Sequence, residues 1–120
     1  MDELQAIESL AALAQATRLA AFRRLIGVYP GGLPAGEIAR LCGVPHNTMS
    51  THLAVLTRSG LLCVERRSRS MNYRVDLDGF RALIGFLTRD CCSGRPEICA
   101  PLMTDVACCE EASASEATHG

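Results

Sequence analysis

The sequence has no tryptophan and no lysine, and aromatic residues make up only 4% of its 120 positions. No apolar run approaches the roughly 18 residues that a membrane-spanning helix needs, which excludes a transmembrane segment. The first residues include Asp2 and Glu3 and lack the basic region and apolar stretch of a signal peptide, so we expect a cytoplasmic protein. The sequence also lacks a nucleophile–base constellation and a phosphate-binding loop, so we expect no enzyme. The length allows one domain with a modest core of Leu, Ala, Ile and Val.

Charge is distributed unevenly along the chain, although the net charge is only −1. All 12 basic residues are arginine, and residues 45–75 contain five of them against the single acid Glu65. Residues 105–120 carry four acids and no arginine. Such an asymmetry predicts a basic surface that attracts an acidic partner such as nucleic acid. The small and acidic residues 105–120 predict a disordered tail, which leaves residues 1–104 as the folded domain.

Apolar spacing predicts helices at residues 3–14, 16–28 and 35–42, and a fourth from Pro45 to about Ser59. Leu4, Ile7 and Leu10 recur at helical spacing in the first of these helices. The second repeats the pattern with Leu19, Phe22, Leu25 and Ile26. Gly43 provides a left-handed cap and a turn between the third and fourth helices. A helix, a short glycine turn and a second helix are the elements of a helix-turn-helix.

After Gly60 the pattern changes to strand-like alternation on both sides of an arginine-rich turn. This pattern predicts a hairpin with strands at about 61–66 and 71–75. Asp76 then caps a last helix through FRALIGFLTRD, which ends before Gly94 and Pro96. The predicted fold is therefore mainly α with a β-hairpin wing (α+β), a winged helix-turn-helix.

The chemistry of these elements suits DNA. The fourth helix offers short polar side chains that can touch base edges in a major groove, and the hairpin offers arginines for phosphates or the minor groove. The DNA-binding candidates are His46, Asn47, Thr48, Ser50, Thr51, His52, Arg66, Arg67 and Arg69.

Seven cysteines require an explanation, because a cytoplasmic disulfide framework is disfavoured and the number is odd. Cys91 and Cys92 follow the last helix, and Gly94 and Pro96 allow the chain to reverse so that Cys99 approaches the pair. Three thiolates without a fourth ligand suit a trivalent ion such as As(III) or Sb(III), whereas structural zinc usually takes four ligands. Cys108 and Cys109 are candidate accessory ligands. Cys42 and Cys63 lie on apolar faces and are expected in the core.

Residues 10–88 resemble the ArsR family (ArsR/SmtB type) of metalloregulatory repressors. The resemblance rests on ALAQATRLAAFRRL, on AGEIARLCGVPHNTMSTHLAVLTRSGLL and on the wing ending RSMNYRV. It implies a homodimer joined by its first and last helices that binds a palindromic operator and releases it when an inducer binds. No permanent cofactor is expected. The cysteines after the last helix resemble those of an arsenic-responsive branch of this family, which has a vicinal cysteine pair and a following cysteine there. This resemblance implies Cys91, Cys92 and Cys99 as ligands.

The chain also departs from the family pattern. The first helix of its helix-turn-helix offers only Cys42 where well-studied arsenic repressors have a cysteine pair. Its last helix offers Asp90 but none of the histidines of zinc-sensing relatives. Three alternatives remain open: a Cd(II), Pb(II) or Zn(II) sensor, a thiol redox or sulfide sensor, and a metallochaperone that binds no DNA.

Overall fold

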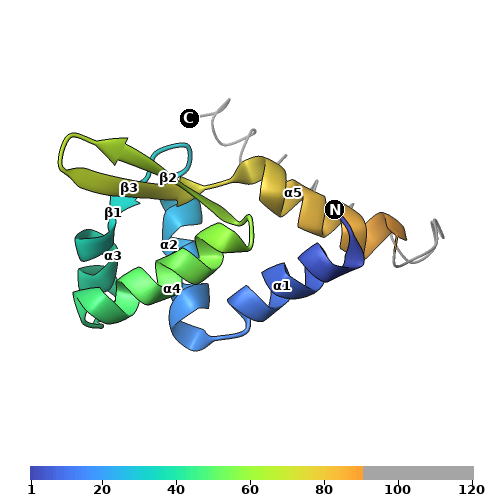
Figure 1. Ribbon diagram of the computed structural model, residues 1–120, viewed down its shortest axis with the longest axis horizontal. Helices are drawn as coiled ribbons and strands as arrows, with labels where there is room; N and C mark the ends of the chain where they lie inside the picture. Colours follow the sequence, from blue (N-terminus) through green and yellow to red (C-terminus); the bar gives the residue numbers. More distant parts are fainter. Residues whose placement is uncertain (91–120) are drawn as a thin grey trace, which may run out of the picture. The chain divides into compact units, whose positions relative to one another are not determined.

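The structure is a computed structural model that describes residues 1–90. In chain order the elements are α1 (Glu3–Leu13), α2 (Ala16–Val28), β1 (Leu33–Pro34), α3 (Ala35–Cys42), α4 (His46–Arg58), β2 (Leu62–Arg67), β3 (Ser70–Val75), α5 (Leu77–Gly85) and a π-helical turn (Phe86–Asp90) (Figure 1). The chain divides into one unit at Met1–Leu83 and a second that starts at Ile84. The predicted winged helix-turn-helix is confirmed, and no helix in the described part is long and apolar enough to cross a membrane.

The first two helices begin at side-chain caps. Asp2 accepts a hydrogen bond from the Gln5 amide (2.8 Å) while the Gln5 side chain accepts one from the Asp2 amide (3.2 Å), so α1 starts with a capping box. Gln15 caps α2 in a similar way by accepting from the amide of Arg18 at 2.8 Å. Because these groups satisfy amides that a helix cannot satisfy itself, both helices begin close to their predicted positions.

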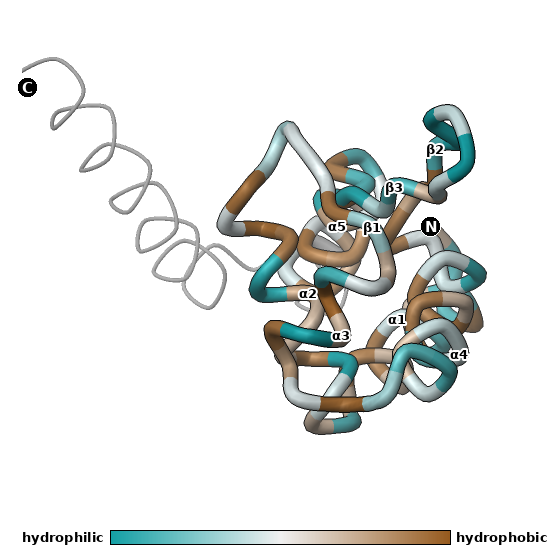
Figure 2. Tube along the Cα trace, turned by 90° about the vertical axis from the view of Figure 1, so that its left-hand side faces the viewer, coloured by the Kyte–Doolittle hydropathy of each residue, from teal (hydrophilic) through white to brown (hydrophobic). Residues whose placement is uncertain are grey.

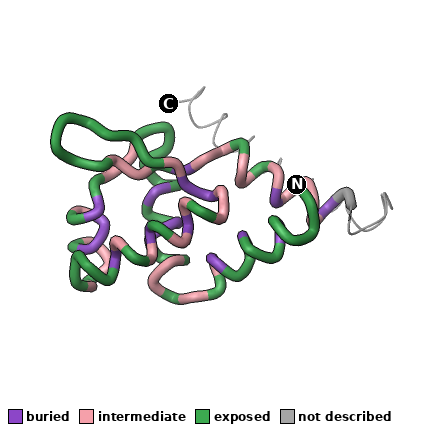
Figure 3. The backbone as a smooth tube through the Cα atoms, viewed as in Figure 1, coloured by how far each residue is buried: buried purple, intermediate pink, exposed green. Residues whose placement is uncertain are grey.

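The apolar stripe of α1 lies on the surface of this chain. The helix buries Ala6, Ser9 and Ala12, whereas Leu4 and Ile7 are 65% and 55% exposed. Leu10 on the same helix and Leu19 and Ile26 on α2 are also exposed. Figure 3 shows that most residues along α1 are exposed. Within residues 1–90, a row of large apolar side chains on α1 and α2 is therefore exposed.

The helix-turn-helix is formed by α3 and α4. Gly43 lies between them in the left-handed region (φ 69°), where the absence of a Cβ removes the steric cost. Its amide donates to the carbonyl of Arg40, and the Val44 amide donates to that of Ala39. The buried faces of both helices meet in the core, where the largest fully buried side chains include Ile38, Met49, Leu53 and Leu56.

The wing is a three-stranded antiparallel sheet in the order β1-β3-β2. Its two long strands match the predicted hairpin to within one residue at each end. The short strand β1 was not predicted, and it pairs Leu33 with Tyr73 at the base of the hairpin. Gly32, just before β1, lies so close to the backbone of Tyr73 that no Cβ fits there. The hairpin tip turns at Ser68 (φ 57°) and is hydrophilic (Figure 2).

The start of the last helix, α5, is hydrogen-bonded to the segment that follows α4. The Asp76 amide donates to the Leu61 carbonyl (2.9 Å), and the Asp76 side chain caps α5 by accepting from the Gly79 amide (3.1 Å). Phe80 on α5 packs edge-to-face on Phe22 of α2, with ring centroids 5.2 Å apart. The predicted cap at Asp76 is therefore present. In the second unit, the Thr88 hydroxyl donates to the Ile84 carbonyl (2.8 Å).

Candidate nucleic-acid interface

The outer face of α4 is polar and accessible. His46, Asn47, Thr48 and Thr51 are exposed and Ser50 is half-buried. On the opposite face Met49, Leu53 and Leu56 are fully buried, which fixes the orientation of the helix on the core. The predicted set of polar side chains on this helix therefore faces outward, with His52 as the exception described below. Short polar side chains on an exposed helix are suited to contact base edges.

A groove with a volume of about 300 Å³ lies between the wing and the helix-turn-helix. It is lined by the first residues of α3, by His46 and Ser50 of α4, and by Arg69, Met71 and Tyr73 of the wing. The structure thus brings together one arginine and two helix residues that were predicted separately from distant segments. Met71 and Tyr73 were not predicted as site residues. The alternation of side chains along β3 could have identified them, because residues 71, 73 and 75 share one face of that strand.

The arginines of the wing differ in their surroundings. Glu65 forms ion pairs with the Nε atoms of Arg67 (3.4 Å) and Arg74 (3.9 Å). The register of the hairpin places Glu65 on the same face as Arg67 and Arg74. This face is formed by residues 63, 65, 67, 70, 72 and 74. Within residues 1–90, Arg66 and Arg69 have no ion pair. The charge of Arg67 is therefore partly neutralised by the protein itself, whereas Arg69 lines the groove and has no ion pair in the described residues.

His52 is half-buried and contacts α2. Its Nδ1 lies 3.3 Å from Nη1 of Arg18. Because a guanidinium can only donate, a hydrogen bond between these two groups has Nδ1 of His52 as the acceptor. The predicted DNA-contacting role of His52 is thus accompanied by an internal role that the sequence did not indicate.

On α3, Arg40 donates to both carboxylate oxygens of Glu37. Hydrogen bonding and the charge of Arg40 lower the pKa of Glu37 below its ordinary value of 4.5. Both side chains are solvent-accessible, so the pair adds little charge of either sign to this helix.

The predicted metalloid ligands Cys91, Cys92 and Cys99, and the candidate accessory ligands Cys108 and Cys109, lie outside the described residues. The two cysteines inside them, Cys42 on α3 and Cys63 on β2, are free thiols and half-buried. Among residues 1–90, no group of three His, Cys, Asp or Glu side chains is placed to hold a metal ion.

A family model described as a helix-turn-helix domain matches residues 13–65, which span α2, the helix-turn-helix and the first residues of the wing. No curated protein matches the chain.

Several solved structures are similar. The homodimeric winged helix-turn-helix DNA-binding domain Mb0332 from Mycobacterium bovis, described as a possible ArsR-family transcriptional regulator, is 28% identical with a TM-score of 0.58, covering 66% of this chain and 71% of its own. A possible transcriptional regulator for arsenical resistance is 26% identical with a TM-score of 0.60, covering 67% and 80%. HlyU from Vibrio cholerae N16961 is 26% identical with a TM-score of 0.59, covering 77% and 99%. The likeness therefore extends over about two-thirds or more of the chain.

Proposed function

We propose that this chain is an ArsR-family winged helix-turn-helix transcriptional regulator that acts as a homodimeric repressor. In this proposal it binds a palindromic operator and releases it when cysteine thiolates bind As(III) or Sb(III). The observation that carries the DNA-binding part is the shared groove of α4 and the wing, which holds His46, Ser50 and Arg69 on one surface. In this proposal the polar face of α4 enters the major groove and the wing arginines contact phosphates.

The homodimer is supported by the exposed apolar stripe of α1. Leu4, Ile7 and Leu10 are each more than 40% exposed in the single chain. Contiguous exposed apolar side chains usually mark an interface. The similar domain from M. bovis is homodimeric, which favours a second copy of this chain as the partner. We therefore place α1 at the dimer interface.

The metalloid part of the proposal depends on the donor set. Cys91, Cys92 and Cys99 supply three thiolates, and a pyramidal trivalent ion is satisfied by three soft ligands. Zinc would draw a fourth ligand, and histidine is absent between residues 53 and 118. The similar structure described as a possible regulator for arsenical resistance favours the same ligand class.

Release would require the ligand to favour a conformation that does not bind the operator. α5 precedes the cysteines in the chain, and the residue before it is hydrogen-bonded to the segment after α4, because the Asp76 amide donates to the Leu61 carbonyl. A change in the cysteine segment would therefore act on α5, and through this contact on the recognition helix α4. Near-complete release needs the bound ion to favour the released state by about 5 kcal/mol.

The test is fluorescence anisotropy of labelled promoter DNA with the reduced full-length protein. Arsenite and antimonite are expected to release the DNA at low stoichiometry, and zinc is not. Cys92→Ser should bind DNA normally and resist release. Cys63→Ser, which also removes one thiol, is the matched control and should release normally.

Two outcomes would contradict the sensor assignment. Release that survives in Cys92→Ser excludes this ligand set. DNA binding that metals leave intact and an oxidant abolishes would assign the cysteines to a redox switch, and mass spectrometry would then identify the disulfide. A protein that binds arsenite but no DNA would overturn the repressor function itself.

A further inference from the structure

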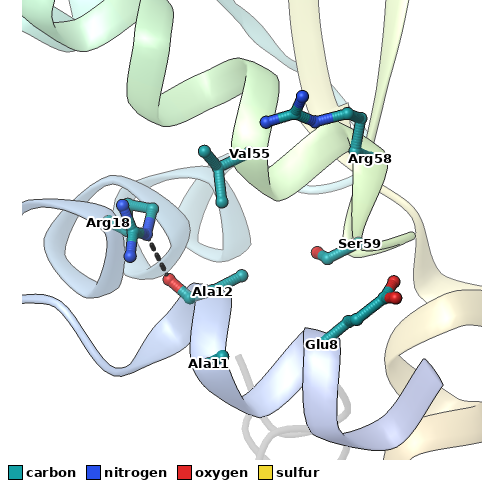
Figure 4. Close-up of a pocket in the computed structure, with 7 residues that line it drawn as sticks. All are labelled: Glu8, Ala11, Ala12, Arg18, Val55, Arg58 and Ser59. Atoms are coloured by element: carbon teal, nitrogen blue, oxygen red, sulfur yellow. Dashed lines mark hydrogen bonds between the residues drawn. The ribbon is translucent and has the colours of Figure 1, made fainter. Parts of the chain in front are cut away.

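α1 and α4 enclose a groove with a volume of about 420 Å³ (Figure 4). The side chains that line it from the two helices include the small residues Ala11, Ala12 and Val55. Large apolar side chains of α1 point elsewhere, since Leu4, Ile7 and Leu10 are exposed. These three large apolar side chains of α1 therefore do not fix the position of α4 along the groove.

Two polar contacts join the helices instead. Ser9 of α1 is fully buried, and its hydroxyl donates to the carbonyl of Ser59 at the end of α4 (3.0 Å). The other contact runs through Arg18, the third residue of α2. Its Nε donates to the carbonyl of Ala12 (2.6 Å), and its Nη1 donates to Nδ1 of His52 near the middle of α4 (3.3 Å). One guanidinium thus spans the end of α1 and the side of α4.

Arg18 is well suited to this position. The last carbonyls of a helix have no partner within the helix and carry its partial negative charge, and α1 has no basic residue in its last turn. The planar guanidinium supplies both a donor and a positive charge to that end. Gln15 holds the base of the arginine by accepting a hydrogen bond from the Arg18 amide (2.8 Å). The backbone of Arg18 is therefore held by Gln15, and its Nε is held by the Ala12 carbonyl.

We propose that Arg18 is a positioning residue for operator binding, which holds α4 at a fixed place relative to α1 through His52. The inference rests on the proposed function, in which α1 joins the two protomers and α4 reads each half-site. In such a dimer the distance between the two α4 helices depends on the placement of α4 relative to α1 in each protomer. Since half-sites lie about one helical turn apart, ~34 Å, the Arg18 contact determines which spacing is bound.

The experiment compares three kinds of DNA: the promoter operator, the operator with one base pair added or removed between the half-sites, and an isolated half-site. Arg18→Met should lower affinity for the operator about tenfold, because a charge-assisted hydrogen bond to His52 is lost. Its preference for the natural spacing over the altered ones should fall, while half-site affinity stays within about twofold. Arg23→Met is the matched control, because Arg23 is an exposed arginine on the same helix. It should keep both affinity and spacing preference.

Variants of His52 test whether the effect passes through this residue. His52→Leu should reproduce the loss, and Arg18→Met combined with His52→Leu should lose no more than either alone. His52→Gln should restore most of the spacing preference, because its amide oxygen can accept from Arg18. Thermal melting of each variant identifies any that fails to fold. If Arg18→Met does not fold, the Leu and Gln variants of His52 decide the question.

The outcomes separate this inference from the proposed function. An unchanged spacing preference in Arg18→Met overturns the positioning role. Loss of half-site affinity in His52→Leu but not in Arg18→Met also overturns it and assigns His52 to direct DNA contact. If the unmodified protein shows no preference for two spaced half-sites, the proposed function as a homodimeric repressor of a palindromic operator is contradicted.

Discussion

The first turn of α5 lies directly against the carbonyl oxygen of Gly60, and Gly79 permits this approach because no Cβ fits between the two residues. Gly60 lies in the left-handed region (φ 90°) just after α4. The contact is therefore between backbone atoms on both sides, with no flexible side chain to absorb a change. It connects the end of α4 to the start of the helix that leads toward the cysteines.

Gly79→Ala is expected to destabilise the protein by about 1–3 kcal/mol, because the methyl group must displace backbone atoms. The free energy of unfolding from urea titrations at equal protein concentration measures this. Gly27→Ala is the matched control, since a Cβ at Gly27 of α2 meets nothing within 4 Å. Replacement of a helical glycine there should stabilise by about 0.5–1 kcal/mol. Equal effects of the two substitutions would show that the contact at Gly60 is not tight.

Glu65→Gln is expected to tighten DNA binding about two- to fivefold at low salt, because it removes the acid that pairs with Arg67 and Arg74. Affinity by fluorescence anisotropy at several salt concentrations measures the effect, which should shrink as salt rises. Asp78→Asn serves as the control, because Asp78 is an exposed acid on α5 rather than on the wing. Equal gains for the two variants would indicate a general effect of net charge.

Ile7→Glu is expected to convert the dimer to a folded monomer. Ile7 is 55% exposed in the single chain, so a charge there leaves the core of the protomer intact but opposes association with an apolar surface. Sedimentation velocity measures the mass, and circular dichroism checks the helix content. Glu8→Gln, which alters the next residue without adding charge, should leave the association unchanged. A dimer that persists in Ile7→Glu would place the interface away from this stripe.

Glu37→Gln is expected to lower stability slightly at neutral pH and not at all in acid. Arg40 holds the pKa of Glu37 below 4.5 in the folded protein, so the pair stabilises the fold when Glu37 is ionised. This contribution is present above pH 4.5 and is lost as the pH falls through the lowered pKa. Urea midpoints of the two proteins should differ at pH 7 and converge once the pH falls below the lowered pKa of Glu37. A difference that persists in acid, or that resists high salt, would assign it to another cause.

The order and the approximate bounds of the helices and of the hairpin could be predicted from the sequence, because their signals are local. Apolar spacing identifies α1 to α4, and Gly43 marks the turn between α3 and α4. The strand β1 has only two residues, and it exists because Leu33 meets Tyr73, 40 positions away. Such a pairing leaves no periodicity to detect.

The contacts that individual side chains make were harder to predict than the helices and strands. The apolar spacing of α1 was recognised, but spacing alone does not tell whether the same chain or a second copy covers the stripe. The contact between Arg18 and His52 joins residues 34 positions apart, so neither residue signals it locally. The polar face of α4 was predicted because amphipathicity is a local property. The roles of Cys91, Cys92 and Cys99 stay predictions, because these residues lie outside the described part.

The hairpin tip has a practical consequence for the protein in solution. Arg69 lies at the exposed turn, Arg66 and Arg67 end the adjoining strand β2 and are also exposed, and the chain has no lysine. Trypsin, which cleaves after arginine and lysine, therefore meets a cluster of its sites at one accessible loop, where proteases preferentially cut. A cut there would divide the chain into one fragment with α4 and another with α5 and the C-terminal cysteines. Protection of this cut by added DNA would give a footprint of the wing without any label on the protein.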